Sequence, residues 1–141
     1  LRSKYNNINQ LNQRTMGLDM YAQVRSNKPK TAVDFKTEEG VEDRELHYWR
    51  KHPNLHGWME SLYYLKGGTA ESFNCVNVLI ESDDLDQLER HIKERHLPQT
   101  AGFFFGNSQS DEREVEDDLQ FIKEARRTIA AGEYVYYTSW W

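Results

Sequence analysis

The chain has 141 residues, a formal net charge of -5, 38% hydrophobic residues and 13% aromatic residues. This length is typical of one domain with one hydrophobic core. The excess of acids excludes a strongly basic nucleic-acid binder, because neutralising phosphates requires an excess of Lys and Arg. Cys75 is the only cysteine. It excludes a scaffold held by intrachain disulfides and is compatible with a reducing, cytoplasmic environment. No apolar run is long enough for a membrane span, so we expect no membrane partner.

Residues 1–15 are rich in Asn and Gln and show little hydrophobic periodicity. Two interpretations stay open for them: a flexible polar N-terminal extension, or sequence upstream of a native start at Met16. We expect residues 16–141 to form a single globular domain.

Three segments near the N-terminus have strand or loop patterns. Residues 18–25 alternate apolar and polar side chains, which predicts a half-buried strand. Residues 26–43 contain Asn, Pro, Gly and many charges, which predicts a loop with a short strand near 33–35. Residues 45–50 predict a second strand.

The middle of the chain predicts a helix, a strand and a second helix. Pro53 suits a first helical turn with His52 near the N-cap, and apolar residues follow at helical spacing from Leu55 to Leu65. Residues 73–80 are rich in β-branched side chains and predict a central strand. Ser82 or Asp83 caps the next helix, which ends near Leu97 and Pro98.

The C-terminal third contains aromatic segments on either side of a long helical pattern. Residues 102–106 (GFFFG) predict a short strand or strand-like turn. Ser108 or Ser110 caps a helix that runs to about Ala131, and residues 133–141 predict a final strand. We expect that strand to lie inside the sheet, because so aromatic an edge would promote aggregation.

The order of these elements predicts an α+β fold. The simplest architecture is a single-layer antiparallel or mixed sheet of about four to five strands, with three helices on one face.

Three histidines, His47, His52 and His56, lie within ten residues of one another. The i, i+4 spacing of His52 and His56 is found in some zinc sites, with Glu45, His47 or Asp19 as a further ligand. The alternative is that His52 caps a helix and that His56 is a partly buried, hydrogen-bonded residue. Paired cysteines and the HExxH motif are absent from the sequence, so we expect no metal and no cofactor.

A second candidate site surrounds a predicted junction between a strand and a helix. Arg50 and Lys51 lie beside the start of a helix that carries His56 and Trp58, which is a suitable setting for a small anion. In a catalytic version, His56 is the acid–base group, Arg50 holds the anion and Asp19 orients His56. The alternative is that Arg50 stacks on a nearby Trp and pairs with a local acid.

Aromatic residues supply further ligand-binding candidates. Phe104 marks a binding surface if its side of the predicted strand is open, and belongs to the core if it is covered. In the final strand, Tyr137 and Ser139 share one face and Trp140 lies on the other. Such a strand could line a pocket or form a subunit contact, or it could simply be packed.

Three acidic runs occur, at residues 38–45, 81–86 and 111–118. Runs of this kind are usually solvated helix starts. Together they could also dock a basic partner.

Four motifs occur in a fixed order: MGLDMY at 16–21, YWRKHPNLHGW at 48–58, LPQTAGFFFG at 97–106 and YYTSWW at 136–141. In these motifs the chain resembles a family of small phage and prophage proteins, whose members often carry the label phosphoglycerate kinase. The chain has neither the length nor a nucleotide-binding motif for that two-domain kinase. The resemblance implies a viral or prophage origin and a native start at Met16, and it implies no particular activity.

We therefore expect a phage or prophage accessory protein in the host cytoplasm. Our first hypothesis is a non-enzymatic module that binds a host or phage protein, because no catalytic motif is recognisable. The alternative is a small-ligand-binding protein or small enzyme with an anion pocket at Arg50 and His56. A weaker alternative is a virion or assembly component, and the protein could also form a homo-oligomer.

Overall fold

The computed structural model describes residues 17–36, 40, 42–102 and 105–141. Its elements, in chain order, are β1 (Asp19–Arg25), β2 (Arg44–Arg50), α2 (Pro53–Leu65), β3 (Val78–Ile80), α3 (Ser82–Lys93), α4 (Glu112–Ala130) and β4 (Tyr134–Trp140). The strands form one antiparallel sheet in the order β2-β1-β4-β3. The predicted α+β fold with a single sheet and three helices is confirmed.

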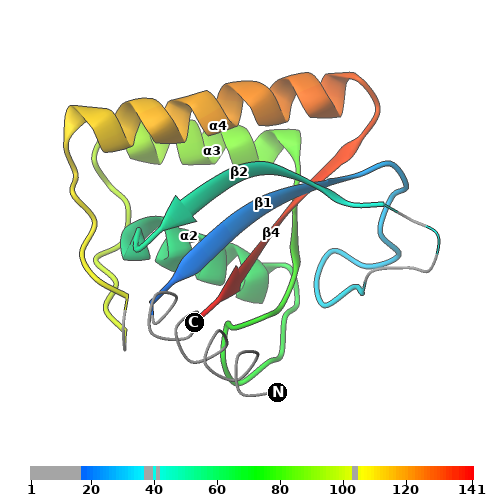
Figure 1. The fold of residues 1–141 in the computed structure, drawn as a ribbon, viewed down its shortest axis with the longest axis horizontal. Coiled ribbons are helices and arrows are strands. Elements are labelled where there is room, and N and C mark those ends of the chain that lie inside the picture. Colours follow the sequence, from blue (N-terminus) through cyan, green and yellow to red (C-terminus); the bar gives the residue numbers. More distant parts are fainter. Residues whose placement is uncertain (1–16, 37–39, 41, 103–104) are drawn as a thin grey trace, which may run out of the picture.

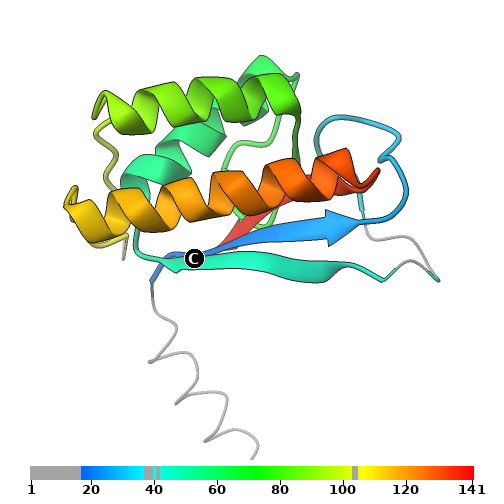
Figure 2. The same ribbon diagram turned by 90° about the horizontal axis from the view of Figure 1, so that it is seen from above.

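The helices lie on one side of the sheet, and the opposite side carries no helix of the described residues (Figures 1 and 2). Side chains alternate along each strand, so Met20 and Ala22 of β1 point toward the helices with Val135 and Tyr137 of β4. They pack there with Leu55 and other apolar residues of the helices in one core. The sheet therefore has an inner face that is buried and an outer face that is not covered by helices.

Strand β4 is interior, as its aromatic content predicts. It pairs with β1 from Asp19 opposite Trp140 to Arg25 opposite Tyr134, and with β3 on its other side. Good strand-forming residues such as Val, Tyr, Thr and Trp make up most of it, and both of its edges are hydrogen-bonded.

Two predicted strands are shorter than expected, for the same backbone reason. Of the strand predicted at 73–80, only Val78–Ile80 forms, because Cys75 has a φ of 58° and interrupts the extended chain. The strand predicted near 33–35 is reduced to one bridge between Val33 and Val78, because Asp34 also has a φ of 58°.

The serines predicted to cap the long helix do not cap it. The N-cap of α4 is Asp111, whose side chain accepts the Glu114 N–H at 2.9 Å. Ser110 has a φ of 53°, outside the conformation of an N-cap, and Ser108 serves a different helix, as shown below. Within the segment predicted at 102–106, the described residues form no strand, and Phe104 lies outside the described residues.

Candidate functional site

The strand register places Asp19, Arg50 and Trp140 in one row across the outer face. Asp19 is only 2% exposed, and its Oδ1 atom accepts a hydrogen bond from the Tyr48 hydroxyl at 2.5 Å. Trp140 is 50% exposed. Arg50 is also exposed and forms no ion pair with any residue that the structure describes. The row therefore presents a cation and an indole on either side of a buried carboxylate.

The next row of the outer face consists of Tyr48, Tyr21 and Thr138. The Tyr21 and Tyr48 ring centroids are 5.2 Å apart, and Tyr48 is 42% exposed. Burial and the hydrogen bond to Asp19 raise the pKa of Tyr48 to about 12, so its hydroxyl stays protonated at neutral pH. We call these two rows, Arg50–Asp19–Trp140 and Tyr48–Tyr21–Thr138, the outer-face patch.

The β3 side of the outer face is covered by the loop that follows β1. Phe35 from this loop packs with Leu79 and Tyr136 in a small second core. Beside them, buried Arg25 pairs with Asp43 at 3.2 Å. Burial and the hydrogen bond to Asp43 raise the pKa of Tyr136. The patch therefore lies on the part of this face that the loop leaves open, next to exposed Glu45 of β2.

His56 lies on α2, on the inner side of the sheet, and is fully buried. Its Nδ1 atom is 2.6 Å from the Tyr137 hydroxyl, and its ring packs between Phe73 and Phe105. Its Nε2 atom has no hydrogen-bond partner among the described residues. Burial lowers the pKa of His56 to about 4, so the ring is neutral at physiological pH.

The predicted pocket of Asp19, Arg50 and His56 does not form. Asp19 and Arg50 are neighbours on the outer face, whereas His56 lies in the core on the other side of the sheet. Successive side chains of a strand point to opposite faces of the sheet. Asp19 therefore points to the outer face, whereas its neighbour Met20 points to the core that contains the α2 helix of His56. His56 therefore has the structural role considered as the alternative, that of a buried, hydrogen-bonded residue.

The other predicted ligand-binding residues are divided between the core and the surface. Tyr137 and Ser139 are buried on the inner face. Trp58 is 8% exposed, and its indole N–H donates to Nδ1 of His91 at 2.9 Å. Lys51 is exposed, and its backbone N–H donates to the Leu18 carbonyl at 2.8 Å.

The three histidines considered as metal ligands each have a different partner. His47 faces Asp117 at 3.1 Å, His52 is bonded to Asp118, and His56 is bonded to Tyr137. Within the described ranges, no group of three or more His, Cys, Asp or Glu residues could hold a metal ion.

His52 belongs to a buried polar network that the sequence does not reveal. Its Nε2 atom lies 2.8 Å from Oδ2 of Asp118, and its Nδ1 atom lies 2.7 Å from Oγ of Ser108. Oδ1 of Asp118 accepts the Trp49 indole N–H at 3.1 Å, and Oγ of Ser108 accepts the Asn54 backbone N–H at 3.0 Å. Ser108 thus caps α2, a role that the side chain of His52 does not fill.

Burial raises the pKa of Asp118, and the hydrogen bond from His52 opposes this shift. One sequence signal for the network exists. Asp118 lies three residues after Val115 and four before Ile122, on the apolar stripe of α4. An acid on such a stripe requires a buried partner, but the sequence does not say which one.

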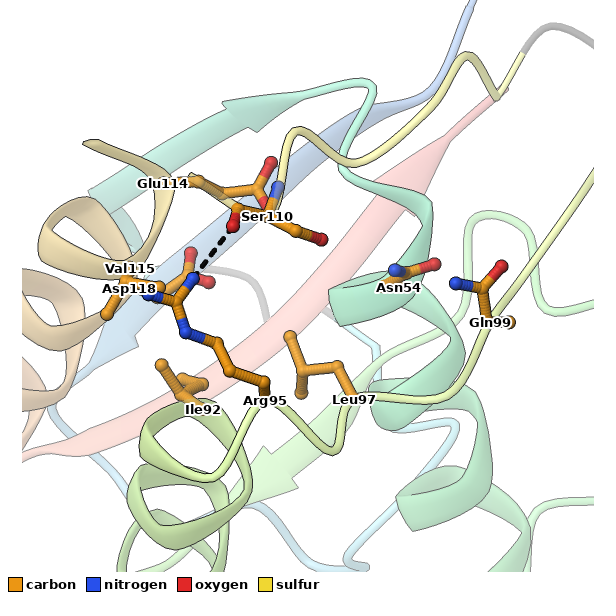
Figure 3. A pocket seen from close by; sticks show the side chains of 9 residues that line it. All are labelled: Asn54, Ile92, Arg95, Leu97, Gln99, Ser110, Glu114, Val115 and Asp118. Carbon is orange, nitrogen blue, oxygen red and sulfur yellow. Dashed lines mark hydrogen bonds between the residues drawn. The ribbon is translucent and has the colours of Figure 1, made fainter. Parts of the chain in front are cut away.

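A small cleft adjoins this network, where α2, the segment after α3 and the start of α4 meet (Figure 3). Its volume is about 80 Å³. Arg95 crosses it and donates to the Ser110 carbonyl at 2.7 Å and to Glu112 at 2.9 Å. The lining residues are Asn54, Ile92, Arg95, Leu97, Gln99, Ser110, Glu114, Val115 and Asp118.

Comparisons with protein-family models, with curated proteins and with solved structures gave no match. None of the described helices is both long enough and apolar enough to cross a membrane.

Proposed function

We propose that the protein is an interaction module that binds a polypeptide segment through the outer-face patch. The observation that carries this proposal is the exposure of Tyr48 and Trp140 beside Arg50, which has no ion-pair partner among the described residues, on a face that none of the described helices covers. Tyr, Trp and Arg are the residue types most enriched at the energetic centres of protein interfaces. The resemblance to phage and prophage proteins directs the search for the partner to phage and host proteins.

The charge distribution favours a partner segment that carries a carboxylate beside apolar side chains. Many acids are in α3 and α4, on the far side of the sheet from the patch. At the patch, Asp19 is buried and hydrogen-bonded and Arg50 is exposed. The exposed acid Glu45 lies beyond Tyr21, at the end of the patch opposite Arg50. A carboxylate from the partner would form a bidentate pair with the Arg50 guanidinium, and its apolar side chains would cover Tyr48 and Trp140.

The sheet edges are less suitable than the face. The segment at residues 32–34 bonds to β3 and covers that edge, through hydrogen bonds from Asp34 to Asn77 and from Leu79 to Ala32. The pairing of β1 with β2 is irregular between Ala22 and Gln23, and a bulge of this kind discourages a further strand from pairing with β2. A partner bound on the face would cover the exposed Tyr48 and Trp140 side chains. A strand added at a sheet edge would leave them exposed.

The test is selection of a library of displayed random peptides against the full chain. We expect the selected peptides to contain Asp or Glu beside an aromatic or aliphatic residue. We expect Arg50→Glu to weaken their binding at least tenfold, because it replaces an attraction with a like-charge repulsion. The matched control is Arg113→Glu, which makes the same charge change at an exposed position of α4.

Three results would contradict the proposal: no peptide selected, peptides that bind both charge variants equally, or peptides without acids. Analytical sedimentation of the wild-type chain tests whether a second copy of the protein, rather than a different polypeptide, binds the patch. If a dimer forms and Arg50→Glu dissociates it, the patch binds a second copy rather than a different polypeptide.

A further inference from the structure

The network of His52, Asp118 and Ser108 has the bonding order of a nucleophile, a base and an orienting acid. Ser108 is half-buried, whereas His52 and Asp118 are 3% and 2% exposed. The two hydrogen bonds of the imidazole, to Ser108 at 2.7 Å and to Asp118 at 2.8 Å, are within the distances that such sites require. The three residues come from three separate segments of the chain.

With Asp118 ionised, the surrounding hydrogen bonds determine the tautomer of His52. An ionised Asp118 only accepts, so Nε2 of His52 carries a proton and donates it to Oδ2. Nδ1 is then the basic nitrogen. Oγ of Ser108 already accepts the Asn54 N–H, so its own proton points to Nδ1. This is the proton arrangement of an activated serine, with the two imidazole nitrogens exchanged relative to serine proteases.

The adjoining cleft borders the network at Asp118 and at Asn54, the residue whose backbone N–H bonds to Ser108. Ser108 and His52 do not line it, so a substrate would meet Oγ from the half-exposed side of Ser108. Oδ1 of Asn54 accepts the Thr100 N–H, so its amide nitrogen is the end that can donate to a bound group. The start of α2 contributes the positive end of a helix dipole beside Oγ.

We infer that Ser108, His52 and Asp118 form a hydrolytic site for carboxylic esters. Oγ of Ser108 bonds to the ester carbonyl carbon while Nδ1 of His52 takes the hydroxyl proton. The carbon–oxygen bond to the leaving group breaks, and the alcohol leaves with that proton. Water then attacks the acyl-serine, His52 takes a proton from the water, the acid leaves, and Ser108 regains its proton.

Ser108 and His52 are the catalytic residues of this site, and Asp118 is a positioning residue. The site is on the inner side of the sheet and is independent of the outer-face patch. Its activity and the peptide binding proposed above can therefore fail separately.

The experiment is labelling of the full chain with a small fluorophosphonate, with the adduct located by mass spectrometry. We expect one adduct, on Ser108, and hydrolysis of p-nitrophenyl acetate at least a hundredfold slower in Ser108→Ala. Ser26→Ala, at an exposed position in the loop after β1, should hydrolyse the ester at the wild-type rate. A folded wild-type chain without an adduct, or with its adduct elsewhere, overturns the inference.

Two further measurements keep the test independent of the stability of Ser108→Ala, which also loses a helix cap. In Ser108→Cys, we expect the new thiol to react with iodoacetamide at pH 6 at least tenfold faster than the exposed Cys75 of the same chain. Nitrogen NMR of the wild-type chain should show His52 protonated at Nε2, and Asp118→Asn should redistribute that proton. Equal thiol rates, or a wild-type His52 protonated at Nδ1, would overturn the inference.

Discussion

The Nδ1 atom of His56 lies 2.6 Å from the hydroxyl oxygen of Tyr137, in the middle of the core. One residue comes from the first described helix and the other from the last strand, so this hydrogen bond joins the two layers of the fold. Both residues are fully buried, and burial lowers the pKa of His56 and raises that of Tyr137. Each is therefore held in its neutral form.

This pairing predicts that the fold loses stability in mild acid. The pKa of His56 is about 4 in the fold and near 6.5 in the unfolded chain, so the unfolded chain binds the extra proton between these values. The contribution of His56 is fully present above pH 6.5 and falls by up to about 1.4 kcal/mol per pH unit as the pH drops toward 4. Urea unfolding at pH 7.5, 5.5 and 4.5 measures this slope. His56→Phe keeps an aromatic ring and removes the titration, so its slope should be shallower. Equal slopes would contradict the assignment.

The two exposed aromatics of the outer-face patch should differ in their effect on stability. Tyr48→Phe removes the hydroxyl that donates to buried Asp19, so we expect a loss of about 1–3 kcal/mol. Trp140→Ala removes a half-exposed side chain at the end of β4 and should cost about 1 kcal/mol or less. Urea unfolding at pH 7.5 compares the two variants. The reverse order would mean that Asp19 does not depend on Tyr48.

Gly57 should resist replacement although it lies within a helix. Gly→Ala in an exposed helix stabilises by about 1 kcal/mol. A Cβ atom at Gly57, however, would overlap the side chain of Thr100. We expect Gly57→Ala to destabilise by about 1–3 kcal/mol through overpacking. Adding Thr100→Gly removes the clash and should recover most of the loss in thermal unfolding. A Gly57→Ala variant that is more stable than wild type would contradict this packing.

Breaking the buried network at His52 should be costly. His52→Ala leaves Asp118 buried with the Trp49 indole as its remaining hydrogen-bond donor, and we expect a loss of about 3–5 kcal/mol. Thermal unfolding measures it. The control is His96→Ala, whose ring is exposed and pairs only with Glu94, and which should change stability by less than about 0.5 kcal/mol. Similar small losses in both variants would show that the network contributes little.

The fold was largely predictable because it follows from local patterns. Alternation in β1, the apolar stripes of α2, α3 and α4, and the strand-forming residues of β4 each determine an element without reference to distant residues. The shortening of β3 was not predictable, because it depends on a left-handed backbone at Cys75, a residue type without a preference for that conformation.

The candidate sites were only partly predictable. Arg50 and Trp140 were identified as binding residues, and the structure places them on the open surface of the patch. Asp19 and His56 were grouped as an orienting acid and an acid–base group, but they lie on opposite sides of the sheet. Ser108 and Asp118 were missed because the hydrogen bonds of His52 reach across 56 and 66 residues of sequence. Only the three-dimensional packing brings such distant residues together.

The position of β4 between β1 and β3 has a consequence for synthesis on the ribosome. Strand β1 is made first, but its longest pairing, from Asp19 opposite Trp140 onward, must wait for a strand made after all three helices. Until then the nascent chain can pair only β1 with β2, and the apolar side of this pair, with Met20 and Ala22, lacks its packing against β4. Pairings this distant in sequence form slowly. We therefore expect chaperones that bind exposed apolar strands to bind the nascent chain. A translation stall before Tyr134 would leave the chain without β4 and unable to complete the sheet.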